Sequence, residues 1–554
     1  MTAVASRPTT ESPVIVPGEV DRAGSLAGFG VLVRLALRRD RIRILLWFLG
    51  IVGLVVSTAV SITGVYNTPA KLEQYAQIVR GNSALIVQAG PGYGLDVPTT
   101  GAVMMNELSL WTLIAVGLMS VFMIVRHTRA EEEMERAEMI RAAPVGRHAQ
   151  VVAAMAGVAV VNVLVALGAV VSLLLYDLPV VGSLAFGLTL IGSGLVFASV
   201  AAVAAQVASG ARAALAIGGA AIGASFVLRA VGDVSEGLLS WLSWLSPLGW
   251  GQGIRAFADE RWWLLVLQLV FAGALVLVAV QLQNWRDFGA GMIAHRSGRA
   301  EASQWLAGPF GLAVRLQRAS VLGWMVGVGL IGFFYGIVAN EAESIVEDSP
   351  EMAEFFAALG ESSITDAFLA TASLMLALIA TGFTVSSVLR LRSEELSSRA
   401  DPILATQTPR PRWVVSHLVV AVGGTILIMF VTGLAMGVGF ALASGDVGQV
   451  VAIVGATVVT VPAMLVLGAL ATVLYGFSPR WALLAWAGFT WAIVAGLFGT
   501  LIDFPQWALD LSPFEHVPAI PASSFELLPV LLLCAAAVAL TWAGLVAFTR
   551  RDVQ

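Results

Sequence analysis

The side chains best suited to polar chemistry concentrate in one motif that occurs twice in the chain. Residues 129–138 read RAEEEMERAE (the first motif) and residues 392–401 read RSEELSSRAD (the second motif), so both fit R-x-E-E-x-x-x-R-A-[ED]. A helix would pair three sets of side chains: Arg129 with Glu133, Glu132 with Arg136, and Glu395 with Arg399. Each such pair is worth about 0.2–0.5 kcal/mol, which favours a helix but does not explain two copies. We interpret both motifs as partner-binding helices; the alternative is a charged loop that is merely solvated.

Residues that could catalyse a reaction or hold a metal are scattered. A phosphate-binding loop needs a lysine among glycines, and the single lysine, Lys71, lies far from any such pattern. The five histidines lie at the edges of apolar runs, and the single cysteine, Cys534, lies within the last run, where we expect a buried thiol. We therefore predict no catalytic residue, no metal site and no enzyme activity in this chain by itself. The net charge of −5 gives no reason to expect a nucleic-acid partner.

Composition places these motifs in a membrane protein. The 554 residues are 58% hydrophobic and 12% charged, with a mean hydropathy of +0.86. An apolar helix of about 20 residues crosses the hydrocarbon layer of a bilayer. We expect twelve spans, at about 42–63, 101–125, 150–176, 179–206, 212–232, 263–284, 319–339, 367–389, 414–443, 447–476, 480–501 and 527–549. The predicted fold class is an all-α polytopic membrane protein.

The spans form two similar halves. Besides the motif, each half carries a cap residue followed by proline after its first span, at Thr68-Pro69 and Ser349-Pro350, which predicts a short outer helix. Leu-Ser-Pro recurs at 245–247 and 511–513. We predict four segments: a disordered cytoplasmic tail (1–23), a first half (24–284), a cytoplasmic linker with an interfacial helix (285–318) and a second half (319–554). Since each half has an even number of spans, the six-helix repeats would be parallel.

Basic residues indicate the orientation. With both termini in the cytoplasm, five of the 31 lysines and arginines fall at the outer side: Lys71, Arg80, Arg229, Arg255 and Arg261. The rest lie inside, as the positive-inside rule predicts. Between Ser25 and Arg43, arginines alternate with apolar residues at helical spacing, which indicates an amphipathic helix in the inner interface. The alternative is simply a positively charged flank.

With these features the chain resembles the permease subunits of ABC-2-type ABC exporters, in particular fused actinobacterial permeases for polyketide antibiotics (the tetronasin type) and other drugs. The likeness rests on two halves of six spans, the motif between the second and third spans, and the proline and arginine after it (Pro144 and Arg147; Pro409 and Arg412). It implies that the motifs are coupling helices for a separate ATP-binding subunit, two copies per chain, which would bind ATP and magnesium; this chain would need no cofactor. The implied coupling residues are Arg129, Glu131, Glu132, Arg136, Arg392, Glu394, Glu395 and Arg399.

The resemblance also implies a route for hydrophobic or amphipathic cargo, such as antibiotics or drugs, out through a bacterial cell membrane. The second and fifth spans of each half would line it, where the candidate residues are Asn106, Glu107, Trp111, Phe226, Arg229, Phe368, Thr371, Phe489 and Trp491. Ordinary helix packing is the alternative for each of them. Glu107 is the strongest candidate, because packing does not call for a carboxylate within a membrane.

Two other classes of function need residues that the sequence scatters. An ion-coupled secondary multidrug carrier would need ionisable groups at mid-membrane, whereas Glu107 and Arg229 come closest and both lie towards outer ends. A polytopic membrane enzyme would need a catalytic acid or a metal cluster at one membrane face. The carrier remains the alternative to an ATP-driven exporter.

Overall fold

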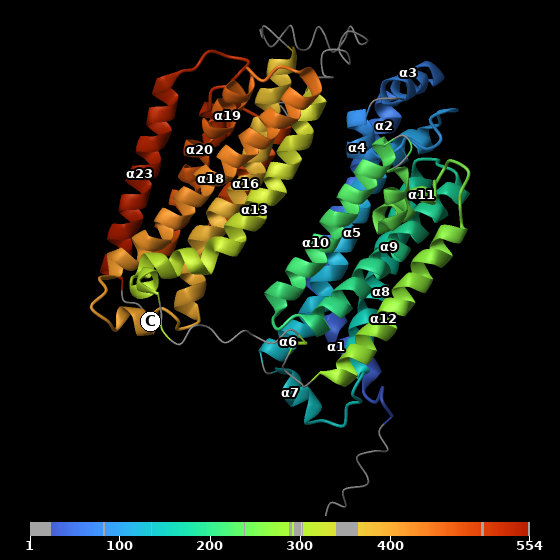
Figure 1. Ribbon diagram of the computed structural model, residues 1–554, viewed down its shortest axis with the longest axis horizontal. Coiled ribbons are helices and arrows are strands. Elements are labelled where there is room, and N and C mark those ends of the chain that lie inside the picture. Colours follow the sequence, from blue (N-terminus) through green and yellow to red (C-terminus); the bar gives the residue numbers. More distant parts are fainter. Residues whose placement is uncertain are drawn as a thin grey trace, which may run out of the picture. The chain divides into compact units, whose positions relative to one another are not determined.

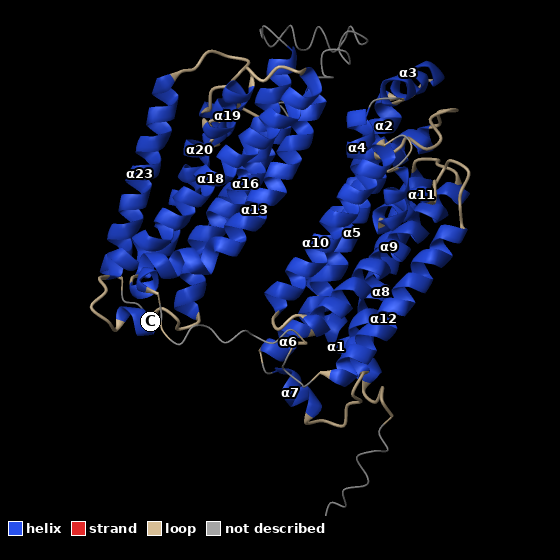
Figure 2. Cartoon of the chain, viewed as in Figure 1, coloured by secondary structure: helices blue, strands red, loops and turns tan. Residues whose placement is uncertain are grey.

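The protein is built from helices arranged in two compact units. Its computed structural model describes residues 24–80, 83–134, 136–235, 237, 239–286, 291–292, 301, 303–339, 364–499 and 504–551, so the predicted tail at 1–23 lies outside the described residues. Within these ranges the regular elements are all helices (Figures 1 and 2). The units are residues 1–297 and 298–554. Eleven helices in the described ranges are long and apolar enough to cross a membrane. The protein is an all-α, multi-pass membrane protein, as its composition predicts.

The first unit holds six of these spans. They are α2 (Arg41–Val65), α5 (Thr100–His127), α8 (Ala149–Leu175), α9 (Val180–Val207), α10 (Ala211–Val234) and α12 (Trp263–Trp285). The shorter helices are α1 (Phe29–Arg39), α3 (Pro69–Val79), α4 (Ser83–Ala89), α6 (Arg129–Glu133), α7 (Arg136–Arg141), η2 (Ser240–Leu245) and α11 (Pro247–Gly253). We call the end of each unit that carries the motif its motif end, and the opposite end its far end.

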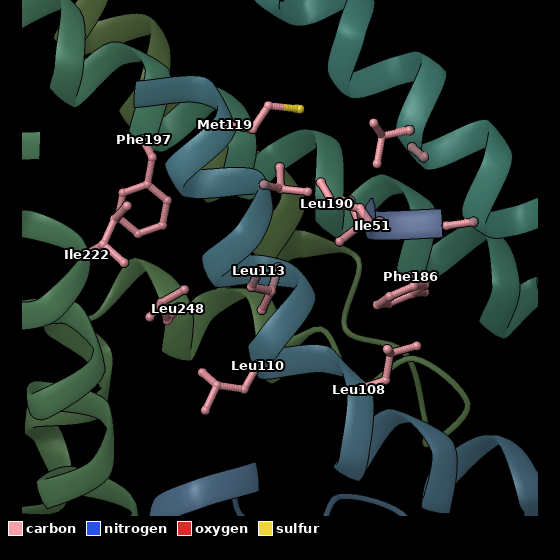
Figure 3. Close-up of a cluster of buried hydrophobic side chains, with 14 of the residues drawn as sticks. Ile51, Leu108, Leu110, Leu113, Met119, Phe186, Leu190, Phe197, Ile222 and Leu248 are labelled. Carbon is pink, nitrogen blue, oxygen red and sulfur yellow. The ribbon is translucent and has the colours of Figure 1, made fainter. Parts of the chain in front are cut away.

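Helices α5 and α9 form the core of the first unit. Both are largely buried, whereas α2 and α12 are mostly exposed. Small residues allow helices to approach closely without a hydrophobic driving force. Phe197 of α9 lies beside Ile222 of α10 (Figure 3), and a Cβ added at Gly117 of α5 would lie 2.9 Å from the Phe197 ring. The tight contact therefore depends on glycine in α5 and fixes the two central spans against each other.

Short capped helices close the far end of the first unit. The Thr68 side chain accepts a hydrogen bond from the Lys71 N–H, and Pro69 is the first residue of α3, so the predicted cap is confirmed. Ser246 caps α11 in the same way by accepting from the Gly249 N–H at 3.1 Å. The second predicted outer helix, at Ser349-Pro350, lies outside the described residues.

The second unit holds five long spans and one shorter apolar helix among its described residues. The spans are α13 (Pro309–Ala339), α16 (Ile364–Leu396), α18 (Arg410–Ser444), α19 with α20 (Val450–Val458 and Val461–Phe477) and α23 (Leu527–Arg550). The shorter helices are η3 (Gln304–Ala307), α17 (Asp401–Leu404), η4 (Trp481–Leu484), α21 (Ala485–Phe498), α22 (Gln506–Leu509) and η5 (Pro513–His516). Helices α13 and α18 touch at glycine, since a Cβ at Gly336 would lie 1.9 Å from the Met436 carbonyl.

Three sequence expectations differ from this structure. The span predicted at 480–501 is η4 followed by the 14-residue α21, so its apolar helix is shorter than a full crossing. The seventh span was expected to begin at about 319, but α13 is continuous from Pro309, so its helix begins within the predicted linker. Cys534 is exposed rather than buried, since it lies on a face of α23 that other helices leave open.

Candidate functional site

The first motif begins where α5 ends. Thr128 leaves the helical conformation (φ −119°, ψ −88°), and its Oγ1 donates a hydrogen bond to the Ile124 carbonyl at 2.6 Å. The short helix α6 follows and ends at Glu133, with Met134 as its C-cap residue, and α7 starts at Arg136. The first motif is therefore two short helices joined by a turn, so helical spacing does not continue across it.

The turn changes which charges meet in the first motif. Arg136 Nε donates to Glu131 Oε2 at 3.1 Å, and Arg129 Nη1 donates to Glu132 Oε2 at 2.8 Å. The predicted pair of Glu132 with Arg136 is wrong, because α6 ends before Arg136. The predicted pair of Arg129 with Glu133 is also wrong, because Glu133 instead accepts a hydrogen bond from the Ala211 N–H. Arginine and glutamate of the motif still pair with each other, but at spacings of three and five residues instead of four.

The second motif reaches the same pairing by a different local route. Helix α16 continues to Leu396, and the chain turns at Ser398, whose φ of 53° is left-handed. Arg399 Nε donates to Glu394 Oε2 at 3.0 Å, the same five-residue spacing as in the first motif. The predicted pair of Glu395 with Arg399 is wrong, because the left-handed turn ends the helix before Arg399.

The acidic pair of each motif is buried. Glu131, Glu394 and Glu395 are 4–5% exposed, and the side chain of Glu132 is 6% exposed. Burying a carboxylate is costly unless it is paired and hydrogen-bonded. Neighbours within the unit satisfy these groups: Glu131, for example, also accepts a hydrogen bond from Arg39 Nη1 of α1 at 2.7 Å. The acidic pair therefore holds its own unit together and does not lie free at the surface.

The second glutamate of each motif pairs with an arginine at the end of the last span. Arg286 is the C-cap residue of α12; its Nη2 donates to Glu132 Oε1 at 2.5 Å and its Nη1 to Oε2 at 2.8 Å. Arg551 is the C-cap residue of α23, and its Nη2 lies 2.9 and 2.8 Å from the two carboxylate oxygens of Glu395. We call these two contacts the C-cap pairs.

Further groups complete each C-cap pair. Gln206, near the end of α9, accepts a hydrogen bond from the arginine Nε of the first pair at 2.7 Å. In the second unit, the Tyr475 hydroxyl of α20 donates to Glu395 Oε2 at 2.5 Å, and the guanidinium lies over the rings of Tyr475 and Phe548. The sequence analysis missed both arginines. The available signal was an arginine directly after the last span of each half.

The first arginine of each motif reaches the loop between the fourth and fifth spans of its unit. Arg129 Nη2 donates to the Ser209 carbonyl at 2.6 Å, between α9 and α10. Arg392 Nε donates to the Pro479 carbonyl at 2.7 Å, between α20 and η4. In the first unit, Glu133 adds a contact to the same loop by accepting from the Ala211 N–H at 3.0 Å. The same contact thus recurs in both units.

An arginine at the start of the third span completes the arrangement. Arg147 Nη2 donates to the Asn284 carbonyl at 3.1 Å, and Arg410 Nη1 donates to the Arg551 carbonyl at 3.2 Å. Basic side chains commonly satisfy the open carbonyls at a helix C-terminus in this way. The sequence analysis matched Arg147 with Arg412, but in the second unit it is Arg410 that binds the carbonyl at the end of the last span.

Asp40 anchors α1 and α2 to the motif end of the first unit. Its buried carboxylate accepts hydrogen bonds from Arg126 Nε at 2.9 Å and Arg43 Nη1 at 2.9 Å, and lies 2.7 Å from His127 Nε2. Burial opposes ionisation, but His127 and Arg126 outweigh it, so the pKa of Asp40 lies below its ordinary value. The charged form is therefore the stable one in the fold.

Two of the predicted cargo-route residues share one partner at the far end. The buried Tyr75 hydroxyl of α3 lies 2.8 Å from Asn106 Oδ1 and 2.6 Å from Glu107 Oε1. Burial and the Glu107 charge raise the pKa of Tyr75 above its ordinary value, so the hydroxyl keeps its proton and can donate. Glu107 is exposed, as is Trp111 one turn further along α5. The sequence analysis missed Tyr75.

Arg229, another predicted route residue, is buried and occupied by structural contacts. It donates to the carbonyls of Ile86 and Val87 at the end of α4, lies 3.7 Å from Asp233, and stacks over the half-buried Phe226 at 5.2 Å. These contacts tie α10 to α4. Arg229 is therefore buried, whereas Glu107 and Trp111 are exposed.

In the second unit the candidate route residues differ in exposure. Thr371 of α16 is exposed, whereas Phe368 is half-buried and lies 6.0 Å from the Tyr335 ring. Phe489 and Trp491 of α21 are also half-buried, and Trp491 lies 5.5 Å from the Phe504 ring. Across the residues that the structure describes, no group of three histidine, cysteine or acidic side chains could hold a metal ion.

Fold and site together define a multi-pass helical membrane protein in which each unit anchors a charged motif with buried ion pairs. Residues 306–549 match the family described as "Multidrug efflux system permease Rv1217c, C-terminal domain". The chain is also 38% identical over 539 residues to the multidrug efflux system permease protein Rv1217c of Mycobacterium tuberculosis (strain ATCC 25618 / H37Rv), with 96% of each chain covered. The chain belongs to this family of multidrug efflux system permeases.

Proposed function

We propose that this chain is the membrane permease of an ATP-driven exporter of hydrophobic or amphipathic compounds, of the ABC-2 type. A separate ATPase subunit, in two copies, would bind ATP and magnesium, one copy at each motif. The motif ends and both chain termini would face the cytoplasm of a bacterial cell, and cargo would leave outward. Two observations support this proposal. The relative is named a multidrug efflux system permease, and the two motifs resemble the coupling helices of ABC-2-type exporters.

The observation that carries the proposal is the recurrence of one contact set in both units. In each unit the motif's first arginine binds the loop after the fourth span, its second glutamate binds the C-cap arginine of the last span, and its last arginine binds the first glutamate. Two separately folded units that hold the same element in the same way support two equivalent docking elements. They also support the proposed two-repeat organisation of the chain.

The acidic pair is buried, so we place the docking surface on the residues that each motif leaves exposed. In the first motif and its continuation these are Glu133, Met134, Glu138 and Met139; in the second, Leu396 is 61% exposed. Exposed apolar side chains beside charges are typical of a protein interface. In this proposal the coupling residues named from the sequence position the surface, while these residues touch the ATPase.

For cargo, we propose the exposed face of α5 in the first unit and of α16 in the second. Glu107, Trp111 and Phe122 are exposed along α5, and Thr371 and Ile379 along α16. Broad apolar and aromatic side chains suit bulky apolar molecules because they adapt to different shapes. Glu107, held by Tyr75, would favour cargo with a cationic group.

Mild-detergent purification of the tagged chain from its native membrane tests the proposal. We expect an ATP-binding subunit to copurify at about two copies per chain. Purification without any ATPase, under conditions that retain a known exporter complex from the same membrane, would refute the proposal and favour an ion-coupled carrier.

A further inference from the structure

The C-cap pairs link parts of each unit that are far apart in sequence. Glu132 and Arg286 are 154 residues apart, and Glu395 and Arg551 are 156 residues apart. Each pair joins the motif to the last span, and the side chains of the four residues are 3–15% exposed. Both C-cap arginines also share an extended backbone conformation, with φ and ψ of −98° and 149° in Arg286 and −91° and 143° in Arg551.

Separating either C-cap pair would be energetically costly. Arg286 binds Glu132 through two nitrogens and two oxygens, the bidentate form that is the strongest common ion pair. Arg551 binds both oxygens of Glu395 through one nitrogen, Nη2, and its guanidinium also lies over two aromatic rings. Removing one partner of a buried pair leaves an uncompensated charge, which is strongly unfavourable. Neighbouring groups raise the cost of opening further, since Gln206 binds the first arginine and Tyr475 binds the second glutamate.

Other contacts extend each C-cap pair into a block at the motif end. The same motif holds the loop between the fourth and fifth spans through Arg129 or Arg392. The start of the third span holds the last span through Arg147 or Arg410. The first glutamate of the motif, by contrast, has a different additional partner in each unit. In the first unit Arg39 of α1 pairs with Glu131, and in the second Arg390 of α16 pairs with Glu394 of the same helix.

We propose that Arg286 and Arg551 are positioning residues for transport: each C-cap pair makes the motif and the end of the last span move as one rigid block throughout the cycle. This inference rests on the proposed function. A displacement that the ATPase imposes on the exposed face of a motif then reaches α12 or α23 directly. Neither arginine contacts the ATPase; each acts through a motif glutamate. The last span of each unit is thus the helix that receives the movement.

The test compares neutral double variants in the reconstituted complex of full chain and ATPase. Glu132→Gln with Arg286→Gln, and Glu395→Gln with Arg551→Gln, remove both charges of a C-cap pair. Glu132→Gln also takes a carboxylate from the buried Arg129, so the double variant of the second unit, where Glu395 pairs with Arg551, is the cleaner test. The measured quantity is cargo moved per ATP hydrolysed. We expect each double variant to lower this ratio about tenfold, the usual scale of coupling between two sites. The control is Glu73→Gln, which neutralises one partner of the exposed pair between Glu73 and Arg80 and should leave the ratio unchanged.

An unchanged ratio in both double variants would overturn the proposal. If a double variant does not accumulate, Arg286→Lys and Arg551→Lys keep the charge. Arg286→Lys loses the two-nitrogen contact with Glu132, and Arg551→Lys loses the planar guanidinium that lies over Tyr475 and Phe548. For these we expect a ratio between the wild-type value and a tenfold loss, and a wild-type ratio would again overturn the proposal. Absence of ATP-dependent transport in the wild-type complex would instead refute the proposed function, so the two failures are distinguishable.

Discussion

Glu132 in the first motif is bound by Arg286, the C-cap residue of α12, through hydrogen bonds of 2.5 and 2.8 Å. In the second unit Arg551 binds Glu395 in the same position relative to its motif and its last span. The motif glutamates, which the sequence analysis assigned to partner binding, therefore stabilise their own unit. The docking surface falls to the neighbouring residues that remain exposed, and this shift shapes the predictions that follow.

Removing the motif glutamate alone should destabilise the first unit. Glu132→Ala leaves Arg286 buried without its carboxylate, and breaking a buried pair in this way costs about 3–5 kcal/mol. Thermal unfolding in detergent should show a clear fall in midpoint for this variant. Glu138→Ala, which changes an exposed residue of α7, should leave the midpoint unchanged. Glu132→Ala combined with Arg286→Met should recover part of the loss, because Arg129 also loses its bond to Glu132; no recovery would contradict the pairing.

Replacing exposed apolar residues of the motifs should weaken ATPase binding without unfolding the chain. Met139 is 70% exposed in the first unit and Leu396 is 61% exposed in the second. Met139→Asp with Leu396→Asp should reduce ATPase affinity by about tenfold or more, as loss of apolar contacts at an interface centre does. Titration of the purified ATPase measures this. Val447→Asp, at an equally exposed residue of a far-end loop, is the control, and equal affinities for the two variants would place docking elsewhere.

Asp40 should make stability depend on pH in the acid range. Its pKa is lower in the fold than in the unfolded chain, so the ionised form stabilises the fold above about pH 4, the ordinary pKa of aspartate. That contribution is lost as pH falls through the lowered pKa. Wild type should therefore unfold at a higher temperature than Asp40→Asn at pH 7, and the two midpoints should converge in acid. A constant difference from pH 7 to pH 3 would contradict this account.

The Tyr75 hydroxyl should hold the far end of α5. Tyr75→Phe removes the hydroxyl that contacts Asn106 and Glu107 and should cost about 1.5–3 kcal/mol, the range for a hydrogen bond to a charged group. The unfolding midpoint of the purified chain measures the cost. Tyr66→Phe, in the ring that contacts Tyr75 edge-on at 5.2 Å, is a matched control and should have a smaller effect. Since both substitutions keep the ring, equal effects would show that the Tyr75 hydroxyl contributes no more than that of Tyr66 and would contradict this account.

Local signals predicted the helices and some of their caps. Runs of apolar residues located the membrane spans, and Thr68 before Pro69 located the start of α3, because both depend on residues close in sequence. Local spacing failed at the motifs, where a turn after Glu133 and the left-handed Ser398 change which charges meet. The span expected at 480–501 also proved shorter, since apolar composition continues where the helix does not.

The C-cap pairs lay beyond what one sequence could reveal. Arg286 looked like a linker residue and Arg551 like a terminal one, and each meets its glutamate only after more than 150 residues of chain have folded. The recurrence of the motif glutamates indicated that they are important. Whether they bind a partner or support the fold depends on whether they are buried, and residue spacing does not show this. Position after the last span was the one feature that the two arginines shared in sequence.

ATP-dependent uptake into inverted membrane vesicles tests the central claim most directly. A fluorescent hydrophobic cation would be added outside vesicles that contain the chain and its ATPase, with a protonophore present to remove the proton gradient. The account predicts that uptake persists with ATP and stops with a non-hydrolysable ATP analogue. Uptake that needs the proton gradient and continues without ATP hydrolysis would contradict it and assign the chain to ion-coupled carriers.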